Sequence, residues 1–207
     1  MMLKQSYNAL LSQKLMAEFA ERNFEGYYCA TKEEALKKAL ELIPKDAVVS
    51  CGGSATLYET GLIDALKNNG YNFLDPNGVT DAKEMDNIAH QALGADYFLM
   101  GANAITESGE LVNADGYGNR VSALIFGPKN VIIIAGVNKV EPDLDAAILR
   151  VKRTAARMII LKFTKDNPGF DQVDKAAEAA VSQLVITSKS VVKGRIKVIL
   201  VGESLGF

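Results

Sequence analysis

Two short apolar segments constrain the fold more than any other feature of the sequence. Residues 97–100 and 131–134 are apolar runs of strand length, and they end at Gly101 and Ala135. Between them the sequence predicts a short helix over residues 120–126. Buried runs of this length that alternate with helices are typical of a parallel sheet covered on both faces. Because ligands bind beyond the carboxyl ends of the strands in such sheets, we expect the working end of the molecule there.

The same alternation continues along the rest of the chain. Further strands are predicted over residues 27–30, 47–51, 71–74, 184–187 and 195–201. Further helices are predicted over residues 6–23, 31–43, 80–93, from 141 and over 171–182, with a break at 167–169. This order favours an α/β fold with a mainly parallel, Rossmann-like sheet and helices on both faces. A length of 207 residues fits one domain, 1–207, with an amino-terminal helical segment, 1–24, packed on it.

Composition and charge exclude several classes of protein. The formal net charge is −2 and there is no basic cluster, so we expect no binding to nucleic acid or to an anionic membrane. No apolar run approaches the roughly 20 residues that span a bilayer. The first residues lack the pattern of a signal peptide, so Cys29 and Cys51 are expected to be reduced thiols in a cytoplasmic protein.

The first candidate site is the turn after the strand 47–51. Gly52, Gly53, Ser54 and Thr56 place backbone amides and two hydroxyls at the start of a helix, where a phosphate or carboxylate is favoured. The alternative is a glycine turn in which Ser54 is an ordinary helix cap. Cys51 at this helix end is either a nucleophile with a lowered pKa or, as we favour, a small buried residue.

The second candidate site is the polar loop that precedes the helix 120–126. Asn113, Asp115, Asn119 and Arg120 converge there, and two glycines between them would let the backbone approach a ligand. Asp115 could act as a general base and Arg120 could bind an anion. The alternative is that Asp115 and Asn119 only hold the turn and cap the helix.

Three further positions complete the candidate set. Gly101 and Asn103 follow the first apolar run and are expected to contact a ligand, whereas Glu107 flanks a hairpin turn and is either solvated or a catalytic acid–base group. His90 is the single histidine, and the two cysteines are far apart in sequence. This pattern contains no zinc or iron–sulfur spacing, so no metal site is predicted and the cofactor remains unknown.

Two long motifs resemble a known family. Residues 52–62 (GGSATLYETGL) and 100–140 (MGANAITESGELVNADGYGNRVSALIFGPKNVIIIAGVNKV) are similar to the LUD-domain family, the lactate-utilisation proteins of the LutC type. The similarity extends from the first helix to the closing residues 194–207. It implies a fold like that of the NagB/RpiA/CoA-transferase group. It also implies a role beside iron–sulfur partner subunits, because some members oxidise L-lactate to pyruvate in such complexes.

Two departures from related patterns limit what the resemblance implies. Relatives of this length often carry a cysteine cluster in the region that corresponds to residues 164–187, which contain no cysteine here. Methylthioribose-phosphate isomerases of the wider superfamily use the aspartate of a GAD-type motif for proton transfer. The matching segment here ends in Asn103, and an amide does not take up a proton at neutral pH. Isomerase chemistry of that kind would need Asp115 in its place.

Three functional hypotheses remain at this stage. In the first, the chain binds a small anionic metabolite and takes part in lactate or related organic-acid utilisation as a subunit or partner of a redox complex. In the second, it is a stand-alone enzyme that acts on a phosphorylated sugar or an acyl-CoA, with Asp115 or Glu107 as acid–base group. In the third, it is a ligand-binding module without catalysis. A homo-oligomer is compatible with each of them.

Overall fold

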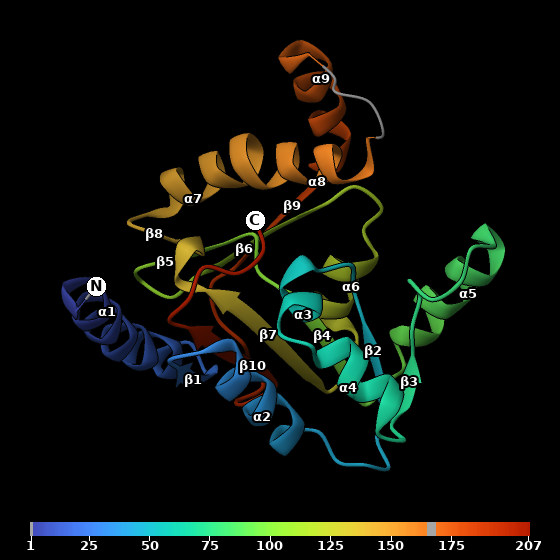
Figure 1. Ribbon diagram of the computed structural model, residues 1–207, viewed down its shortest axis with the longest axis horizontal. Helices are drawn as coiled ribbons and strands as arrows, with labels where there is room; N and C mark the ends of the chain where they lie inside the picture. The colour runs from blue at the N-terminus through green and yellow to red at the C-terminus, as the bar shows by residue number, and fades with distance from the viewer. Residues whose placement is uncertain (1, 165–168) are drawn as a thin grey trace.

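A six-stranded parallel sheet forms the centre of the protein, as seen in a computed structural model that describes residues 2–164 and 169–207 (Figure 1). Its strands, in spatial order, are β1 (Glu25–Cys29), β10 (Ile196–Val201), β7 (Asn130–Gly136), β4 (Tyr97–Gly101), β2 (Val48–Cys51) and β3 (Asn72–Leu74). The two apolar runs are neighbours in it, since β4 and β7 pair in parallel with Gly101 opposite Ile134. The predicted α/β, Rossmann-like class is confirmed.

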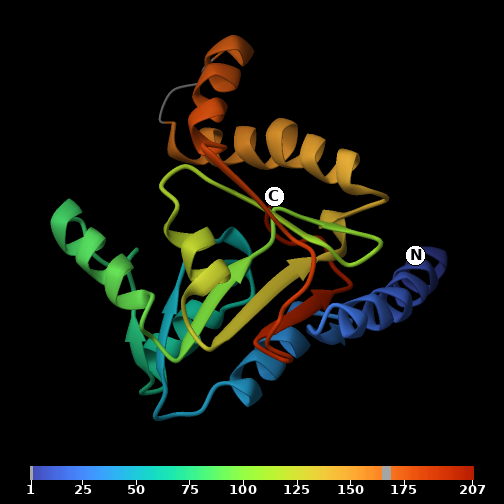
Figure 2. The same ribbon diagram turned by 180° about the vertical axis from the view of Figure 1, so that it is seen from behind.

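Helices cover both faces of this sheet (Figures 1 and 2). On one face lie α2 (Lys32–Leu42), α3 (Ala55–Glu59) and α4 (Leu62–Asn68), and on the other lie α1 (Met2–Glu21), the end of α5 (Ala82–Ala92) and α6 (Asn119–Phe126). Ile132 and Ile134 of β7 pack into the first layer, whereas Val131 and Ile133 pack into the second. This is why the strand is apolar at successive positions. The amino-terminal helix packs on the sheet through its later turns, where Phe19 is fully buried.

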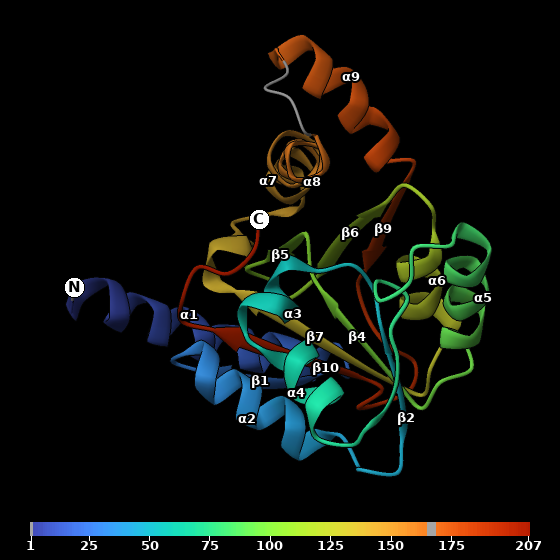
Figure 3. The same ribbon diagram turned by 45° about the vertical axis from the view of Figure 1, so that its right-hand side comes forward.

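A second, smaller sheet stands beyond the carboxyl ends of β4 and β7 (Figure 3). It contains β8 (Val140–Glu141), β5 (Ala104–Thr106), β6 (Leu111–Asp115) and β9 (Gln183–Thr187), in that order. β5 and β6 form the hairpin expected around Glu107, and β9 joins β6 in antiparallel orientation. The sequence predicted its hairpin turn but not the sheet, because β8 and β9 join this hairpin from segments that are distant along the chain.

A helical arm lies over the second sheet (Figure 3). It runs through α7 (Leu144–Arg150), a π-helical turn η2 (Val151–Ala155) and α8 (Ala156–Phe163), which packs against α9 (Phe170–Ala180). Ala147 and Val151 pack on Ala104 and Val112 of the second sheet. Residues 167 and 168 of the predicted break lie outside the described residues. Among the residues described, no helix is long and apolar enough to cross a membrane.

Candidate functional site

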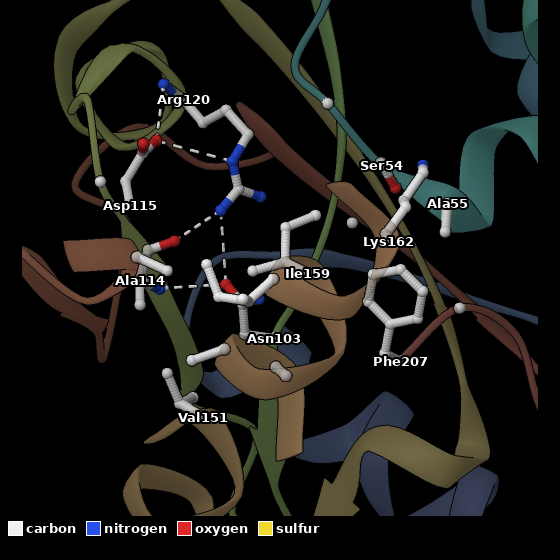
Figure 4. A pocket seen from close by; sticks show the side chains of 18 of the residues that line it. Ser54, Ala55, Asn103, Ala114, Asp115, Arg120, Val151, Ile159, Lys162 and Phe207 are labelled. Atoms are coloured by element: carbon white, nitrogen blue, oxygen red, sulfur yellow. Dashed lines mark hydrogen bonds and ion pairs between the residues drawn. The ribbon is translucent and has the colours of Figure 1, made fainter. Parts of the chain in front are cut away.

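A cavity of about 660 Å³ lies between the carboxyl edge of the main sheet and the helical arm (Figure 4). It is bounded by the start of α3, the ends of β4 and β6, the start of α6, and the inner faces of α8 and α9. Predicted site residues in its wall are Gly53, Ser54, Thr56, Gly101, Asn103, Asp115, Asn119 and Arg120. The fold therefore brings the two candidate sites of the sequence together in one cavity.

Three predicted residues do not line this cavity. Gly52 lies behind the wall, where a Cβ atom would clash with Cγ of Arg120. Asn113 is fully buried in β6, and its Nδ2 has no hydrogen-bond partner among the described residues. Glu107 is on the β5–β6 turn, where its carboxylate accepts a hydrogen bond from Nζ of Lys14 at 2.8 Å. The structure therefore separates Glu107 from the residues with which it was grouped.

The carboxylate of Asp115 is occupied by its own loop. Oδ1 accepts from the backbone N–H groups of Tyr117 at 3.1 Å and Gly118 at 3.0 Å. Oδ2 accepts from the N–H groups of Arg120 at 3.0 Å and Val121 at 3.4 Å, and it lies 3.5 Å from Nε of Arg120. These contacts close the turn and cap α6. They favour the structural interpretation of Asp115 over a role as a general base.

Arg120 is held at the cavity wall by one edge of its guanidinium group. Nη2 donates to the carbonyl oxygen of Ala114 at 2.5 Å and to Oδ1 of Asn103 at 3.4 Å. The same Asn103 oxygen accepts from the Ala114 N–H at 3.0 Å. Burial lowers the pKa of Arg120, while Asp115 raises it. Nη1 has no hydrogen-bond partner within the described part of the chain, and Figure 4 shows it on the side of the cavity where Ser54 lies.

The sequence analysis missed the most unusual group of the cavity, Lys139. This lysine ends the 3-10 turn η1 (Val137–Lys139), is only 4% exposed, and donates from Nζ to Oγ1 of Thr56 at 3.0 Å. No described carboxylate lies within ion-pair distance of Nζ. Burial lowers the pKa of Lys139 to about 7, with further lowering by Arg150 and Arg120 and an opposing effect of Glu59. The signal in the sequence was a lone lysine three residues after the end of a buried strand.

Two glycines make room for this amine. A Cβ atom on Gly101 would lie 2.9 Å from Oγ of Ser54 and 3.6 Å from Nζ of Lys139. Gly206 has a φ of +60°, and a Cβ atom there would lie 2.5 Å from Oγ1 of Thr56 and 3.2 Å from Nζ of Lys139. Side chains at either position would fill the space around the amine, so the glycines keep this space free of side chains.

Arg150 fixes the arm above this group. Its Nη1 donates to the carbonyl oxygen of Asn103 at 2.5 Å, and its Nε donates to that of Asn138 at 3.3 Å. Glu141 lies 3.5 Å from the same Nε. Burial lowers the pKa of Arg150, and Glu141 raises it. Arg150 therefore joins the chain segments that follow β4 and β7 and adds positive charge beside Lys139.

The opposite wall of the cavity is mainly apolar, with Lys162 of α8 as a charged side chain in it. It is formed by residues of the arm and by one aromatic side chain near the carboxyl terminus: Val151, Ala155, Ala156, Ile159, Ile160, Phe163 and Phe207. The π-helical turn contributes the first two of these side chains. The cavity thus has two cationic side chains at the sheet and a mainly apolar roof at the arm, which suits a ligand with an acidic head and an apolar body.

Comparison with known proteins supports the resemblance in the sequence. The sequence model of the LUD domain matches residues 12–201. The chain belongs to the LUD-domain family. The LUD fold is also similar to the crystal structure of a DUF162 family protein from Deinococcus radiodurans, with a TM-score of 0.59 at 11% sequence identity. That match covers 94% of this chain and 98% of the other. No curated protein matches the chain.

The cysteine of this LUD domain nearest the site is buried and protonated. Cys51 is 1% exposed, and burial, with Asp75 adding to it, raises the pKa of its thiol to about 12. The interpretation as a small core residue therefore fits better than that of a nucleophile. Ser54 stands at the N-cap position of α3, a helix of five residues, but its side chain makes no capping hydrogen bond. Across the described residues, no group of three His, Cys, Asp or Glu side chains is arranged to hold a metal ion.

Proposed function

We propose that this LUD domain binds an organic acid in the cavity, with the acid group held between Lys139 and Arg120. The observation that carries the proposal is the pair of cationic side chains on the sheet side of the cavity, one of which, Lys139, is buried without a carboxylate partner among the described residues. A third cation in the lining, Lys162 of α8, is exposed to solvent. A buried cation is costly unless a counter-charge is near it. A bound carboxylate or phosphate would supply that charge and would raise the pKa of Lys139 on binding.

The volume and lining of the cavity indicate which kind of organic acid would fit it. A volume of about 660 Å³ is larger than lactate needs and lies within the roughly 300–1,000 Å³ of ordinary small-molecule sites. The apolar roof would gain free energy by covering apolar surface of the ligand, at about 25 cal/mol per Å². We therefore favour an acid that carries an apolar body over a small hydroxy acid alone.

The family gives this binding role a biological setting. The resemblance to LUD-domain proteins implies a role in the utilisation of lactate or related organic acids. In that role, iron–sulfur partner subunits would transfer the electrons. Binding of an organic acid is compatible with it, and the protein would then hold or deliver the acid within such an assembly. A purification from the native host that recovers iron–sulfur proteins with this chain would support this part of the proposal.

Thermal unfolding against a panel of acids tests the binding role. The panel contains lactate, pyruvate, longer 2-oxo and fatty acids, phosphorylated sugars and acyl-CoAs. A ligand at a hundred times its dissociation constant adds about 2.7 kcal/mol to the unfolding free energy, which raises the melting temperature by roughly 5–10 °C.

Two lysine variants make this experiment specific. Lys139→Met should abolish the shift, whereas Lys129→Met, at an exposed lysine outside the cavity wall, should retain it. The proposal is wrong if no acid stabilises the wild-type protein, or if Lys139→Met responds as the wild type does.

A further inference from the structure

We propose that Lys139 is a nucleophilic amine that forms an imine with the carbonyl group of an oxo acid bound in the cavity. The inference rests on the proposed function, since the acid group must be held before the carbonyl can meet the amine. Such an imine would either take part in catalysis or bind the ligand covalently. The substrate class is then acids that carry an aldehyde or ketone group.

The position of the amine supports this role. Nζ of Lys139 lies in the cavity wall with a single hydrogen bond, 3.0 Å to Oγ1 of Thr56, among the residues described. The glycines at 101 and 206 leave the space next to Nζ free of side chains. A structural lysine in a protein interior is instead expected to be paired with a carboxylate. The arrangement therefore leaves a lone pair or a proton of this amine available to a ligand.

The charges around Lys139 favour its neutral form. Burial lowers its pKa most, Arg150 of α7 and Arg120 of α6 lower it further, and Glu59 of α3 raises it. With burial as the largest cause, the pKa is about 7, so about half of the molecules carry a neutral amine at pH 7. An ordinary lysine with a pKa of about 10.4 is neutral in only about one molecule in a few thousand at that pH. Burial beside other cations is a known way to make a lysine nucleophilic.

The anchor for the acid group comes from Arg120. Its Nη2 and Nε are used by the protein, and Nη1 is free of hydrogen bonds within the described residues. A carboxylate that accepts from Nη1 would put the adjacent carbonyl carbon of a 2-oxo acid within the cavity shared with Lys139. The apolar roof then receives the remainder of the molecule.

The reaction balances without any other reagent. The Nζ lone pair bonds to the carbonyl carbon, and the π electrons move to the carbonyl oxygen, which takes a proton while the nitrogen loses one. The resulting carbinolamine loses its hydroxyl group with a proton as water, and the nitrogen lone pair completes the C=N bond. Thr56 Oγ1, at 3.0 Å from Nζ, is placed to relay the proton between nitrogen and oxygen.

Reductive trapping tests the imine directly. The full chain is incubated with pyruvate or 2-oxooctanoate and sodium cyanoborohydride, and then measured by intact mass spectrometry and peptide mapping. We expect a mass increase equal to that of the acid less one oxygen, located on Lys139. The exposed-lysine variant Lys129→Met should show the same adduct, and Lys139→Met should lose it while it keeps its fold by circular dichroism. At acid concentrations well below saturation, the trapping rate should rise from pH 6 and level off above about pH 8, because it then follows the loss of the proton from the ligand-free amine, whose pKa is about 7.

The outcomes separate this inference from the binding proposal. If an acid stabilises the protein in thermal unfolding but reductive trapping gives no adduct at Lys139, the imine proposal is wrong and the binding role stands. If adducts spread over exposed lysines without preference for Lys139, the imine is again wrong. If no acid binds and none is trapped, both proposals fail. Lactate, which has no carbonyl group to attack, should give no adduct in any of these experiments.

Discussion

The polar loop 115–120 and Lys139 line the same cavity, but their charged groups differ in how they are paired. In the loop, both oxygens of Asp115 are occupied by four backbone N–H groups and by Arg120. Lys139 has one hydrogen bond, to a neutral hydroxyl, and no described carboxylate within ion-pair distance. The carboxylate of the loop is paired within the loop itself, whereas the amine of Lys139 has no charged partner among the described residues.

This contrast shows why a dense polar motif is a poor guide to function by itself. Short polar side chains between glycines form hydrogen bonds to their own backbone, as Asp115 does with the next residues. A lone charged residue after a buried strand has no such local partner. When the fold then buries it, its free energy depends on what enters the cavity.

The largest effect is expected on the unfolding free energy, when the loop 115–120 loses the carboxylate of Asp115. Asp115→Ala removes the acceptor of four backbone N–H groups and leaves a buried guanidinium without its carboxylate. We expect the unfolding free energy to fall by about 3–5 kcal/mol, measured by denaturant titration, because breaking a buried ion pair leaves an uncompensated charge. A variant of unchanged stability that loses only ligand binding or turnover would instead make Asp115 a functional carboxylate.

The next largest effect is expected on the pH dependence of the unfolding free energy, and it comes from Lys139. Its pKa is about 7 in the folded protein and about 10.4 in the unfolded chain, so the unfolded state binds more protons between these values. Stability therefore rises with pH in this window, by about 2 kcal/mol between pH 7 and pH 9. The difference in unfolding free energy between the wild type and Lys139→Met isolates this contribution. A difference that stays constant over the window would mean that the lysine remains charged in the folded state.

A glycine pair tests how closely Arg120 is packed. A Cβ atom on Gly52 would clash with Cγ of Arg120, whereas the nearest atom to one on Gly53 is Oδ1 of Asn77 at 3.8 Å. Gly52→Ala should cost about 1–2 kcal/mol of unfolding free energy through overpacking. The matched control Gly53→Ala should stay within about 0.5 kcal/mol, as surface substitutions usually do. Equal effects of the two substitutions would contradict the packing described for Arg120.

The smallest effect is expected at Glu107. This carboxylate pairs with Lys14 on the protein surface, and such pairs contribute about 1 kcal/mol or less. Glu107→Ala should therefore change stability by less than about 1 kcal/mol and leave acid binding intact in the thermal assay. Loss of acid binding in this variant would show that Glu107 contributes to the site.

The sequence predicted the parallel sheet and one half of the site for a physical reason. Runs such as 131–134 are buried on both faces, so their composition reports their position directly. Ser54, Asn103 and Arg120 follow strands whose carboxyl ends meet, and the structure places them in one cavity.

The other half of the site depends on contacts between distant segments. Lys139 bonds to Thr56, and it is surrounded by Gly101 and Gly206. In the sequence it looks like any solvated lysine. The second sheet and the arm are also products of such contacts, since β9 pairs with β6 across the whole of α6 to α9. No local pattern contains this information.

The titration of Lys139 itself is the most direct test of the proposed site. Lysine side chains labelled with carbon-13 at Cε can be followed by NMR from pH 5 to pH 11, and the Lys139→Met variant assigns the signal. We expect a midpoint at a pH of about 7, which moves upward when an organic acid is bound. A midpoint near the ordinary value of about 10.4 would mean that the amine is solvated or paired, and would contradict the central role given to it.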